Sequence, residues 1–211
     1  MTQNNPPNAL GHIFIIDDDG SMRQALQRML KEAGYSVEVY ESAKLFLEKS
    51  FPISPATILL DMQMPDMTGV ELQEQLVKLG RTTPIIFISG QSQPVQIIKA
   101  MKYGALNFLL KPFNLKELLE SISEAIKVDQ ASVKNLYKNT LAKNQFSSLT
   151  NKEREVYSYL IKGMKSKDIA TTLGIVPATI KVHKSRILEK MNVNSSQELI
   201  RQHLESGLTQ D

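Results

Sequence analysis

The chain has 211 residues, of which 42% are hydrophobic and 22% charged, with a net charge of +3 at pH 7. This length suits one large domain or two small ones, and the composition is that of an ordinary soluble protein. The chain contains no cysteine, which excludes disulfide bonds, thiol chemistry and cysteine-bound zinc. The first ten residues lack the basic and then apolar order of a signal peptide, and the longest apolar runs have strand length. We therefore expect a cytoplasmic protein with no membrane segment.

The charge is unevenly distributed along the chain. Residues 1–128 carry 12 lysines and arginines against 14 acidic residues, a net charge of −2. Residues 129–211 carry 13 against 8, a net charge of +5. An acidic front and a basic back indicate different partners, and the basic half is compatible with nucleic acid.

The front half alternates short apolar runs with stretches of helical periodicity. The first run, 12–16, is followed by Met22, Leu26 and Leu30 at helical spacing, and Gly34 ends that helix. The remaining elements are expected at 37–39 (strand), 42–49 (helix), 57–60 (strand), 70–79 (helix), 85–88 (strand), up to about 103 (helix), 108–110 (strand) and from about 114 (helix). Five such units predict an α/β domain with a doubly wound, five-stranded parallel sheet of the flavodoxin-like kind.

Polar residues directly follow four of the predicted strands. They are the acidic run Asp17 to Asp19, then Asp61, Ser89 and Lys111. The carboxyl ends of parallel strands line one crevice of such a sheet, so we expect these side chains to meet. Carboxylates, a hydroxyl and a lysine suit a hard cation and a phosphoryl group. Taken alone, Asp19 is more typical of a helix cap than of a metal ligand, and a lone lysine is usually solvated.

The same strings resemble the receiver domain of two-component response regulators. The resemblance covers residues 12–127 and rests on Asp17-Asp18-Asp19, on Asp61 with the following Met64-Pro65-Asp66-Met67-Thr68-Gly69 loop, and on Ser89-Gly90, Gly104-Ala105 and Lys111-Pro112-Phe113. It implies that Asp61 is the phosphoacceptor. It also implies a Mg2+ cofactor held by Asp18 and Asp61 directly, by Asp17 through water and by the backbone carbonyl of Gln63.

The resemblance also assigns roles to three further residues. Lys111 and Ser89 would contact the phosphoryl group, and their chemistry agrees with this, since phosphoryl transfer needs mainly positioning and charge neutralisation. Phe108 stands where receivers carry a switch aromatic whose orientation follows the phosphoryl-bound hydroxyl of Ser89. A kinase-dependent change of packing at Ser89 and Phe108 is therefore expected to favour a homodimer.

One enzyme family offers an alternative. Asp17-Asp18-Asp19-Gly20-Ser21 also resembles the signature of haloacid-dehalogenase-type phosphatases, with Asp17 as nucleophile and Asp19 as acid and base. That family needs a later acidic pair after its lysine to hold magnesium, and no such pair follows Lys111. This alternative also leaves Asp61 and its loop without a role. We therefore expect no turnover enzyme.

The back half has only helical patterns. Thr150 and Glu153 form a capping box that opens a helix, which closes at Gly163. After a short second helix, Gly174 marks a turn and Pro177 suits the first position of a third helix, which runs to about Met191. A last helix follows the cap at 195–198. Two helices joined at a glycine turn predict a helix-turn-helix.

These strings resemble the LuxR/NarL type of DNA-binding domain. They are 149–156, 167–170, 173–175, 179–183 and 190–193, and the predicted domain spans 148–211. Together with the front half they resemble the FixJ type of regulator. Two residues depart from the pattern. Lys165 stands where a capping serine is common, and Ser166 is expected to cap the helix instead. Val176 replaces the serine before the recognition helix, so that this cap is missing and Pro177 must compensate.

Helical geometry divides the recognition helix into two faces. Ile180, Ile187 and Met191 share a stripe that should face the core. The opposite face carries Ala178, Lys181, Val182 and Ser185 and should meet a major groove, where lysine can reach guanine and valine a thymine methyl. Thr179 is also expected to contact DNA. Phosphate contacts are predicted for Arg154, Lys165, Lys167, Lys184, Arg186 and Lys190.

Residues 128–147 lie between the two predicted domains. They contain no Gly or Pro, and Val133, Leu136, Tyr137 and Leu141 form an apolar stripe. A flexible linker would be rich in Gly and Ser, so we expect a helical linker. The pattern leaves open whether this helix pairs with its twin in a dimer or packs alone on one domain.

The sequence therefore predicts a DNA-binding transcriptional response regulator that is activated by phosphorylation. The expected partners are a sensor histidine kinase, double-stranded promoter DNA, a second copy of the chain and RNA polymerase. The alternative from another class is a constitutive DNA-binding module with a vestigial receiver, against which the complete acidic pocket argues.

Overall fold

The computed structural model describes residues 10–48, 53–90 and 93–208 of the chain. The chain divides into two compact units, Met1–Val133 and Lys134–Asp211, and each is described by itself. Among the residues that the structure describes, no helix combines the length and apolar character that a membrane crossing needs.

The first unit is built on a five-stranded parallel sheet in the order β2-β1-β3-β4-β5. Its strands are β1 (His12–Ile16), β2 (Ser36–Tyr40), β3 (Ala56–Asp61), β4 (Ile85–Ser89) and β5 (Asn107–Leu110). Strands β1, β3 and β4 are buried along their whole length, as expected of inner strands covered on both faces. The predicted doubly wound sheet is confirmed.

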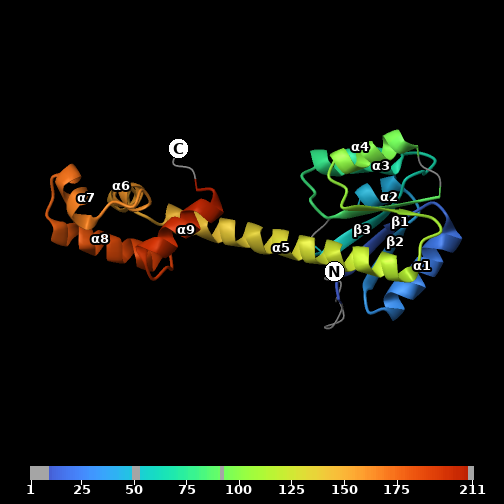
Figure 1. The fold of residues 1–211 in the computed structure, drawn as a ribbon, viewed down its shortest axis with the longest axis horizontal. Helices are drawn as coiled ribbons and strands as arrows, with labels where there is room; N and C mark the ends of the chain where they lie inside the picture. Colours follow the sequence, from blue (N-terminus) through green and yellow to red (C-terminus); the bar gives the residue numbers. More distant parts are fainter. Residues whose placement is uncertain (1–9, 49–52, 91–92, 209–211) are drawn as a thin grey trace. The chain divides into compact units, whose positions relative to one another are not determined.

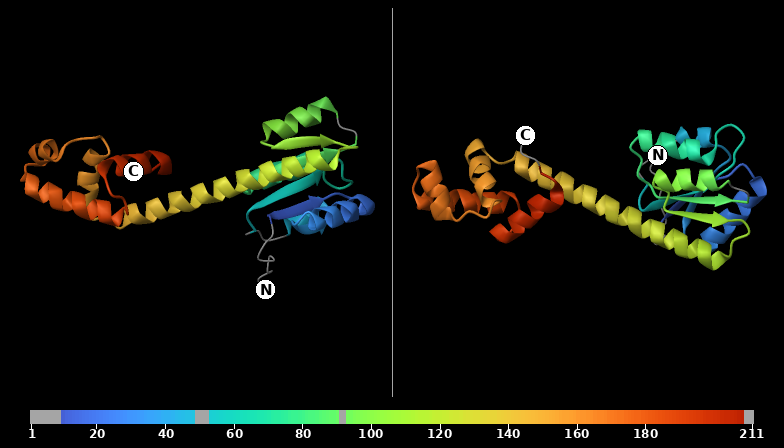
Figure 2. Two further views of the ribbon diagram at one scale, coloured as in Figure 1. Left: turned by 60° about the horizontal axis from the view of Figure 1, so that its bottom comes forward. Right: turned by 45° about the horizontal axis from the view of Figure 1, so that its top comes forward.

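Helices cover both faces of this sheet, as Figures 1 and 2 show from three directions. The helices are α1 (Gly20–Glu32), α2 (Ala43–Leu47), α3 (Gly69–Lys78), α4 (Pro94–Lys102) and α5 (Leu115–Ser147). One core joins α2, α3 and α4 to Phe14, Leu60 and Phe87. A second core, on the other face, joins α1 and the start of α5 to Ile15 and Ile86.

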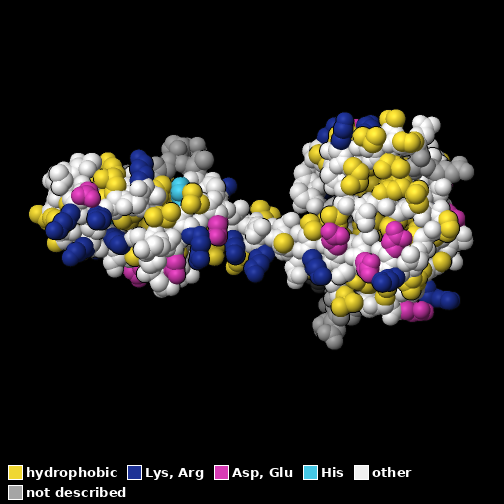
Figure 3. All heavy atoms as spheres, viewed as in Figure 1, with side chains coloured by type: hydrophobic (Ala, Val, Ile, Leu, Met, Phe, Trp, Pro, Cys, Tyr) yellow, Lys and Arg dark blue, Asp and Glu magenta, His cyan; other side chains and the backbone are white. Residues whose placement is uncertain are grey.

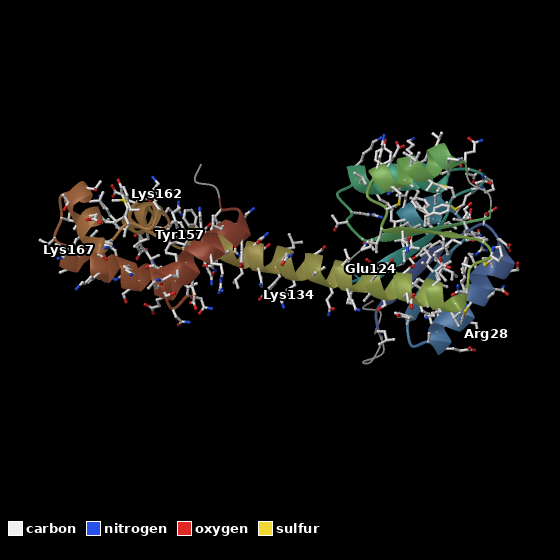
Figure 4. All side chains as sticks on the ribbon, in the orientation of Figure 1. Arg28, Glu124, Lys134, Tyr157, Lys162 and Lys167 are labelled. Atoms are coloured by element: carbon white, nitrogen blue, oxygen red, sulfur yellow. The ribbon has the colours of Figure 1, made fainter. Side chains whose placement is uncertain are left out.

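The second unit contains four short helices and the end of α5. They are α6 (Asn151–Leu160), α7 (Ser166–Leu173), α8 (Pro177–Lys190) and α9 (Ser196–Ser206). Its core is centred on Tyr157, Ile169, Ile187 and Leu199, all fully buried. Tyr157 is labelled among these helices in Figure 4. The predicted helix-turn-helix is present as α7, a turn at Gly174 in the left-handed conformation, and α8.

The predicted linker helix, 128–147, is the C-terminal part of α5. Both ends of α5 belong to a core: Ile122 and Ile126 to the first unit, Ala142 and Phe146 to the second. Val133, Leu136, Tyr137 and Leu141 are all exposed. The predicted domain boundaries at 127/128 and 147/148 and the pairing of two such helices stay predictions.

Local predictions differ from the structure at several element ends, by one or two residues, and at one helix cap. Strand β2 is longer than the predicted 37–39, and α2 ends at Leu47, while Lys49 lies outside the described residues. The proposed cap at Ser166 is wrong, because Ser166 is the first residue of α7 and Lys165 occupies the cap position without a side-chain hydrogen bond. The missing cap before α8 is confirmed, since Val176 offers no side-chain bond and Pro177 begins the helix.

Candidate functional site

The register of the sheet brings the four predicted strand ends together. Ile16 pairs with Leu60, which places Asp17, just after β1, beside Asp61, the last residue of β3. Ser89 pairs with Leu110, so that Lys111 follows β5 beside the end of β4. The backbone amide of Lys111 donates to the carbonyl of Ser89 over 2.8 Å.

Lys111 is the centre of this cluster. Its Nζ donates to Oδ2 of Asp17 over 3.0 Å and to Oδ1 of Asp61 over 2.8 Å. Both carboxylates are buried, with Asp17 only 3% and Asp61 only 7% exposed. Two carboxylates that have little access to water thus share one ammonium.

The electrostatics of this cluster are unbalanced. Burial raises the pKa of Asp61, and the nearby charge of Asp17 adds to this, against the hydrogen bonds from Lys111 and the amide of Gln63. Burial acts to lower the pKa of Lys111, but its bonds to Asp61 and Asp17 outweigh burial and the net shift is upward. The lysine gains two partners, whereas Asp61 shares its one cation with a competitor. Asp61 is therefore a carboxylate whose charge is incompletely compensated.

Gln63, Asp18 and Asp19 have different places and contacts in the structure. The amide of Gln63 donates to Oδ2 of Asp61 over 2.7 Å, which fixes the loop after β3 against the carboxylate. Asp18 is exposed and lines a cavity of about 340 Å³ together with Met64 and Asp66. Asp19 caps α1, accepting from the amides of Ser21 and Met22, as its position in the sequence suggested.

The donor chemistry fits a hard cation, although the described residues contain no ready cluster of three acidic or histidine side chains. The available donors are carboxylate and backbone oxygens, which suit magnesium. Asp17 and Asp61 already share a cation in the form of the Lys111 ammonium. Because both carboxylates are buried and share one positive charge, a bound cation would balance the remaining negative charge.

Gly69 is a site residue to which the sequence assigned no role. A side chain at this position would place its Cβ 2.3 Å from the carbonyl oxygen of Asp61 and 2.9 Å from Phe87. The amide of Gly69 also donates to the carbonyl of Met62 over 3.0 Å. The loop can fold over the end of β3 only because this residue is glycine. The signal was present, since Gly69 closes the loop that the family resemblance quotes.

The predicted switch residues lie on the α2–α4 face of the sheet. Ser89 is 2% exposed at the end of β4. Phe108 of β5 is half-buried, pairs in register with Phe87 and packs against the core under α4. Whether the two move together stays a prediction.

The recognition helix α8 has the predicted two faces. Ile180, Ile187 and the following Met191 are fully buried. Thr179, Lys181, Val182, Ser185 and Arg186 are exposed, and Lys184 is half-buried. Lys165 and Lys167 are exposed at the start of α7. In Figure 3 lysine and arginine side chains gather along α7 and α8, and Figure 4 labels Lys167 on the outside of this unit.

Lys190 differs from the other predicted phosphate contacts. Its Nζ lies 2.6 Å from Oε2 of Glu153 and donates to the carbonyl of Ser148 over 3.2 Å. Glu153 is 3% exposed and also accepts from the amide of Thr150 over 2.8 Å. The bond from Lys190 lowers the pKa of Glu153 to about 2. This ion pair connects the end of α8 to the start of α6, and a phosphate would have to compete with it.

Each half of the chain matches a known protein family. The family described as "Response regulator receiver domain" matches residues 13–123. The family described as "Bacterial regulatory proteins, luxR family" matches residues 147–202. Both matches cover the sites described above.

Individual relatives match over nearly the whole chain. "Response regulator protein TodT" of Pseudomonas putida is 38% identical over 90% of this chain and 83% of its own length. "Transcriptional regulatory protein FixJ" of Bradyrhizobium diazoefficiens is 33% identical over 95% of this chain and 98% of its own. The solved structure of the response regulator StyR is 37% identical, has a TM-score of 0.82 and covers 92% of this chain and 98% of that chain. The chain therefore belongs to the two-component response regulators that combine a receiver domain with a LuxR-type DNA-binding domain.

Proposed function

We propose that Asp61 accepts a phosphoryl group from the phosphohistidine of a sensor kinase, and that this modification controls DNA binding by the second unit. The observation that carries the proposal is the Lys111 ammonium held between the buried carboxylates of Asp17 and Asp61. A carboxylate that is buried and shares its cation is destabilised as an anion, which favours its conversion to an acyl phosphate.

In the proposed reaction a carboxylate oxygen of Asp61 attacks the phosphorus atom. The new P–O bond forms as the P–N bond to the kinase imidazole breaks, and the imidazole nitrogen keeps the electron pair and takes a proton. Lys111, already 2.8 Å from Asp61, neutralises charge on the transferred group, and the hydroxyl of Ser89 donates to one of its oxygens.

The proposed Mg2+ would be held by Asp17, Asp18, Asp61 and the backbone carbonyl of Gln63. Its chemistry there is to neutralise charge between the phosphoryl oxygens and the carboxylates. Within the protein, the hydrogen bond from the Gln63 amide holds the loop against Asp61.

Phosphorylation can be tested with acetyl phosphate as a small donor. Mass spectrometry should find one phosphoryl group that is stable in acid and labile in base, and Asp61→Asn should abolish it. The matched control is Asp66→Asn, which removes an exposed carboxylate from the same loop and should still be labelled. Undiminished labelling of Asp61→Asn would overturn the assignment.

We further propose that the phosphorylated chain dimerises through α4 and β5. Apolar side chains on this face are exposed, with Val95 at 70%, Ile98 at 55%, Met101 at 46% and Leu110 at 59%. Figure 3 shows yellow side chains between α4 and α5 of the first unit. Phe108 lies on β5 between Ser89 and this face, so a rearrangement of Ser89 and Phe108 would change its shape. A symmetric dimer would match paired half-sites on DNA.

The dimer can be tested by light scattering with and without beryllofluoride as a phosphoryl mimic. The mass should double with the mimic, and Ile98→Asp should prevent this. Val77→Asp on α3, where Val77 is 51% exposed, is the matched control. An unchanged mass of the wild-type chain with bound mimic would remove dimerisation as the switch.

The same family membership supports the remaining partners as proposals. Promoter DNA is proposed to bind the exposed face of α8, in the cytoplasm, with RNA polymerase as the partner at the promoter. A vestigial receiver would leave the affinity for DNA unchanged by acetyl phosphate, whereas the proposed regulator should bind DNA more tightly after treatment.

A further inference from the structure

Asp129 is a buried carboxylate in α5 with no part in the phosphoacceptor cluster. It is only 5% exposed. Its Oδ2 accepts from the hydroxyl of Ser54 over 2.7 Å and from the backbone amide of Ala56 over 2.9 Å. These partners lie 75 and 73 residues away in the sequence. Both bonds lie within the first unit.

The position of Asp129 on α5 favours an apolar residue. The preceding residues on the same seam, Ile122, Ala125 and Ile126, pack in the core of the first unit. Aspartate is a poor helix former, and burying its charge costs free energy unless hydrogen bonds compensate. A carboxylate here is therefore better explained by the position in which its hydrogen bonds hold α5 than by a gain in stability.

Asp129 is also the point at which α5 leaves the first unit. From 130 to 141, all of which the structure describes, no residue of α5 is buried, and the next buried residue is Ala142 in the core of the second unit. The side chains that follow on the seam, Val133 and Leu136, are exposed. Asp129 is thus the last buried residue of α5 in the first unit.

The partners of Asp129 belong to the strand that carries the phosphoacceptor. Ala56 is the first residue of β3 and Asp61 is its last. A strand of this kind rises ~3.3 Å per residue, so the two ends are separated by a single stiff element. The strand therefore joins the phosphorylation site at one end to the exit point of α5 at the other.

We propose that Asp129 is a positioning residue that couples the phosphorylation of Asp61 to the DNA-binding unit, by holding α5 to the start of β3. The inference rests on the proposed function of Asp61. The same helix contributes Ile126 to the first core and Ala142 and Phe146 to the second. Loss of the anchor should leave phosphorylation intact and weaken its effect on DNA.

The test compares phosphorylation and DNA affinity in the full chain. The variants are Asp129→Ala, which removes both hydrogen bonds, and Ser54→Ala, which removes one from the partner side. The matched controls are Glu124→Gln, an exposed acid on α5 labelled in Figure 4, and Ser132→Ala, an exposed serine of the same helix. The DNA probe is a duplex selected from a random pool by the acetyl-phosphate-treated wild-type chain.

All variants should be phosphorylated at the wild-type rate and extent. Phosphorylation should raise the affinity of the wild type and of both controls for the duplex. In Asp129→Ala this gain should fall by about five-fold or more, the lower range of coupling between sites in proteins. Ser54→Ala should show a smaller loss of the same kind, and the double variant should lose no more than Asp129→Ala, since both changes break one connection.

The possible failures are distinguishable. A folded Asp129→Ala chain that is phosphorylated and keeps the full gain would show that the anchor is merely structural, which overturns the inference. Should Asp129→Ala unfold, Ser54→Ala decides by the same measurement, because the bond from the Ala56 amide remains in that variant. Absence of labelling at Asp61 in the wild type would instead reject the proposed function.

Discussion

Each unit contains a lysine bound to a buried carboxylate, and the two carboxylates are affected in opposite ways. In the first unit, Lys111 contacts Asp61, and the pKa of Asp61 is raised. In the second unit, Lys190 contacts Glu153, and the pKa of Glu153 is lowered to about 2. The side chains of both acids are almost completely buried, at 9% and 4% exposed, so burial alone does not decide the direction.

The difference lies in which effect is largest at each carboxylate: burial is the largest at Asp61 and raises its pKa, whereas the bond from Lys190 is the largest at Glu153 and lowers its pKa. Among the residues that the structure describes, Lys190 is the one cation paired with Glu153, which also accepts from the amide of Thr150 at the start of α6. Asp61 shares Lys111 with Asp17, whose negative charge lies close by. A fully satisfied carboxylate stabilises a fold, whereas an incompletely satisfied one is available for chemistry. The comparison thus separates an ion pair between one lysine and one carboxylate from a cluster in which two carboxylates share one lysine.

The largest effect is expected from removing the shared cation. Lys111→Ala should reduce the rate of phosphorylation by acetyl phosphate ~10²–10³-fold, the usual cost of losing a donor to developing charge. The rate is measured from the time course of labelling. Lys116→Ala, which removes an exposed lysine near the start of α5, is the control and should react at the wild-type rate. A Lys111→Ala chain as reactive as the wild type would contradict the role of this cluster.

Neutralising the satisfied carboxylate should affect stability instead. Glu153→Gln should lower the free energy of unfolding of the second unit by ~1–3 kcal/mol at pH 7, less than for fully buried pairs because the Lys190 side chain is 35% exposed. Since the folded pKa lies below the usual value, this stability is present above pH ~4.5 and lost as the pH falls toward 2.

Calorimetry at neutral and acid pH measures this difference. Glu155→Gln is the control, because Glu155 forms an exposed pair with Lys152 and should contribute little. The gap in stability between wild type and Glu153→Gln should close at acid pH. A gap that persisted unchanged at pH 2 would mean that the charge of Glu153 is not its source.

Removing a base contact should change sequence preference. Lys181→Ala, and to a lesser extent Val182→Ala, should reduce discrimination between the selected duplex and unrelated DNA by ~1–3 kcal/mol per lost contact. Binding titrations against both duplexes provide the measurement. Lys162→Ala changes an exposed lysine outside α7 and α8 and serves as control. If Lys181→Ala discriminates between the two duplexes as well as the wild type does, the assignment of this face of α8 to base contacts is wrong.

The smallest effect is expected in the salt dependence of DNA binding, where substitutions of two lysines should have different results. Lys167→Ala should flatten the slope of log affinity against log salt by ~1, as for one lost phosphate contact. Lys190→Ala should leave the slope unchanged and lower stability, because its ammonium is held by Glu153. Equal flattening by both variants would mean that the ion pair opens on DNA and that Lys190 contacts phosphate after all.

The sequence predicted the fold and the meeting of Asp17, Asp61 and Lys111, because both depend on local signals. Asp17, Asp61 and Lys111 each follow an apolar run directly, so strand register alone brings them together. The same holds for the buried stripe of α8, which follows from helical spacing. The confirmed capping box of Thr150 and Glu153 spans only three residues.

Contacts between distant parts of the chain could not be predicted in this way. Lys190 and Glu153 are 37 residues apart, and a lysine at the end of a basic helix gives no sign that it is paired inward. Asp129 lies among lysines on a helix that looks solvated, and only the packed structure shows that Ser54 reaches it. The collision of a side chain at Gly69 with Asp61 likewise depends on tertiary packing.

The way in which α5 ends inside the second core has a practical consequence for dividing the protein. Phe146 packs edge-on against Tyr157 with ring centroids 5.1 Å apart, and the guanidinium carbon of Arg154 lies over the Phe146 ring, 5.4 Å from its centroid. A fragment that begins at Ser148 would lack Phe146 and Ala142 and would expose Tyr157. A fragment that begins at Lys134 keeps them. Limited proteolysis should therefore release two folded halves when it cuts within 130–141, and a half with a damaged core when it cuts after 142.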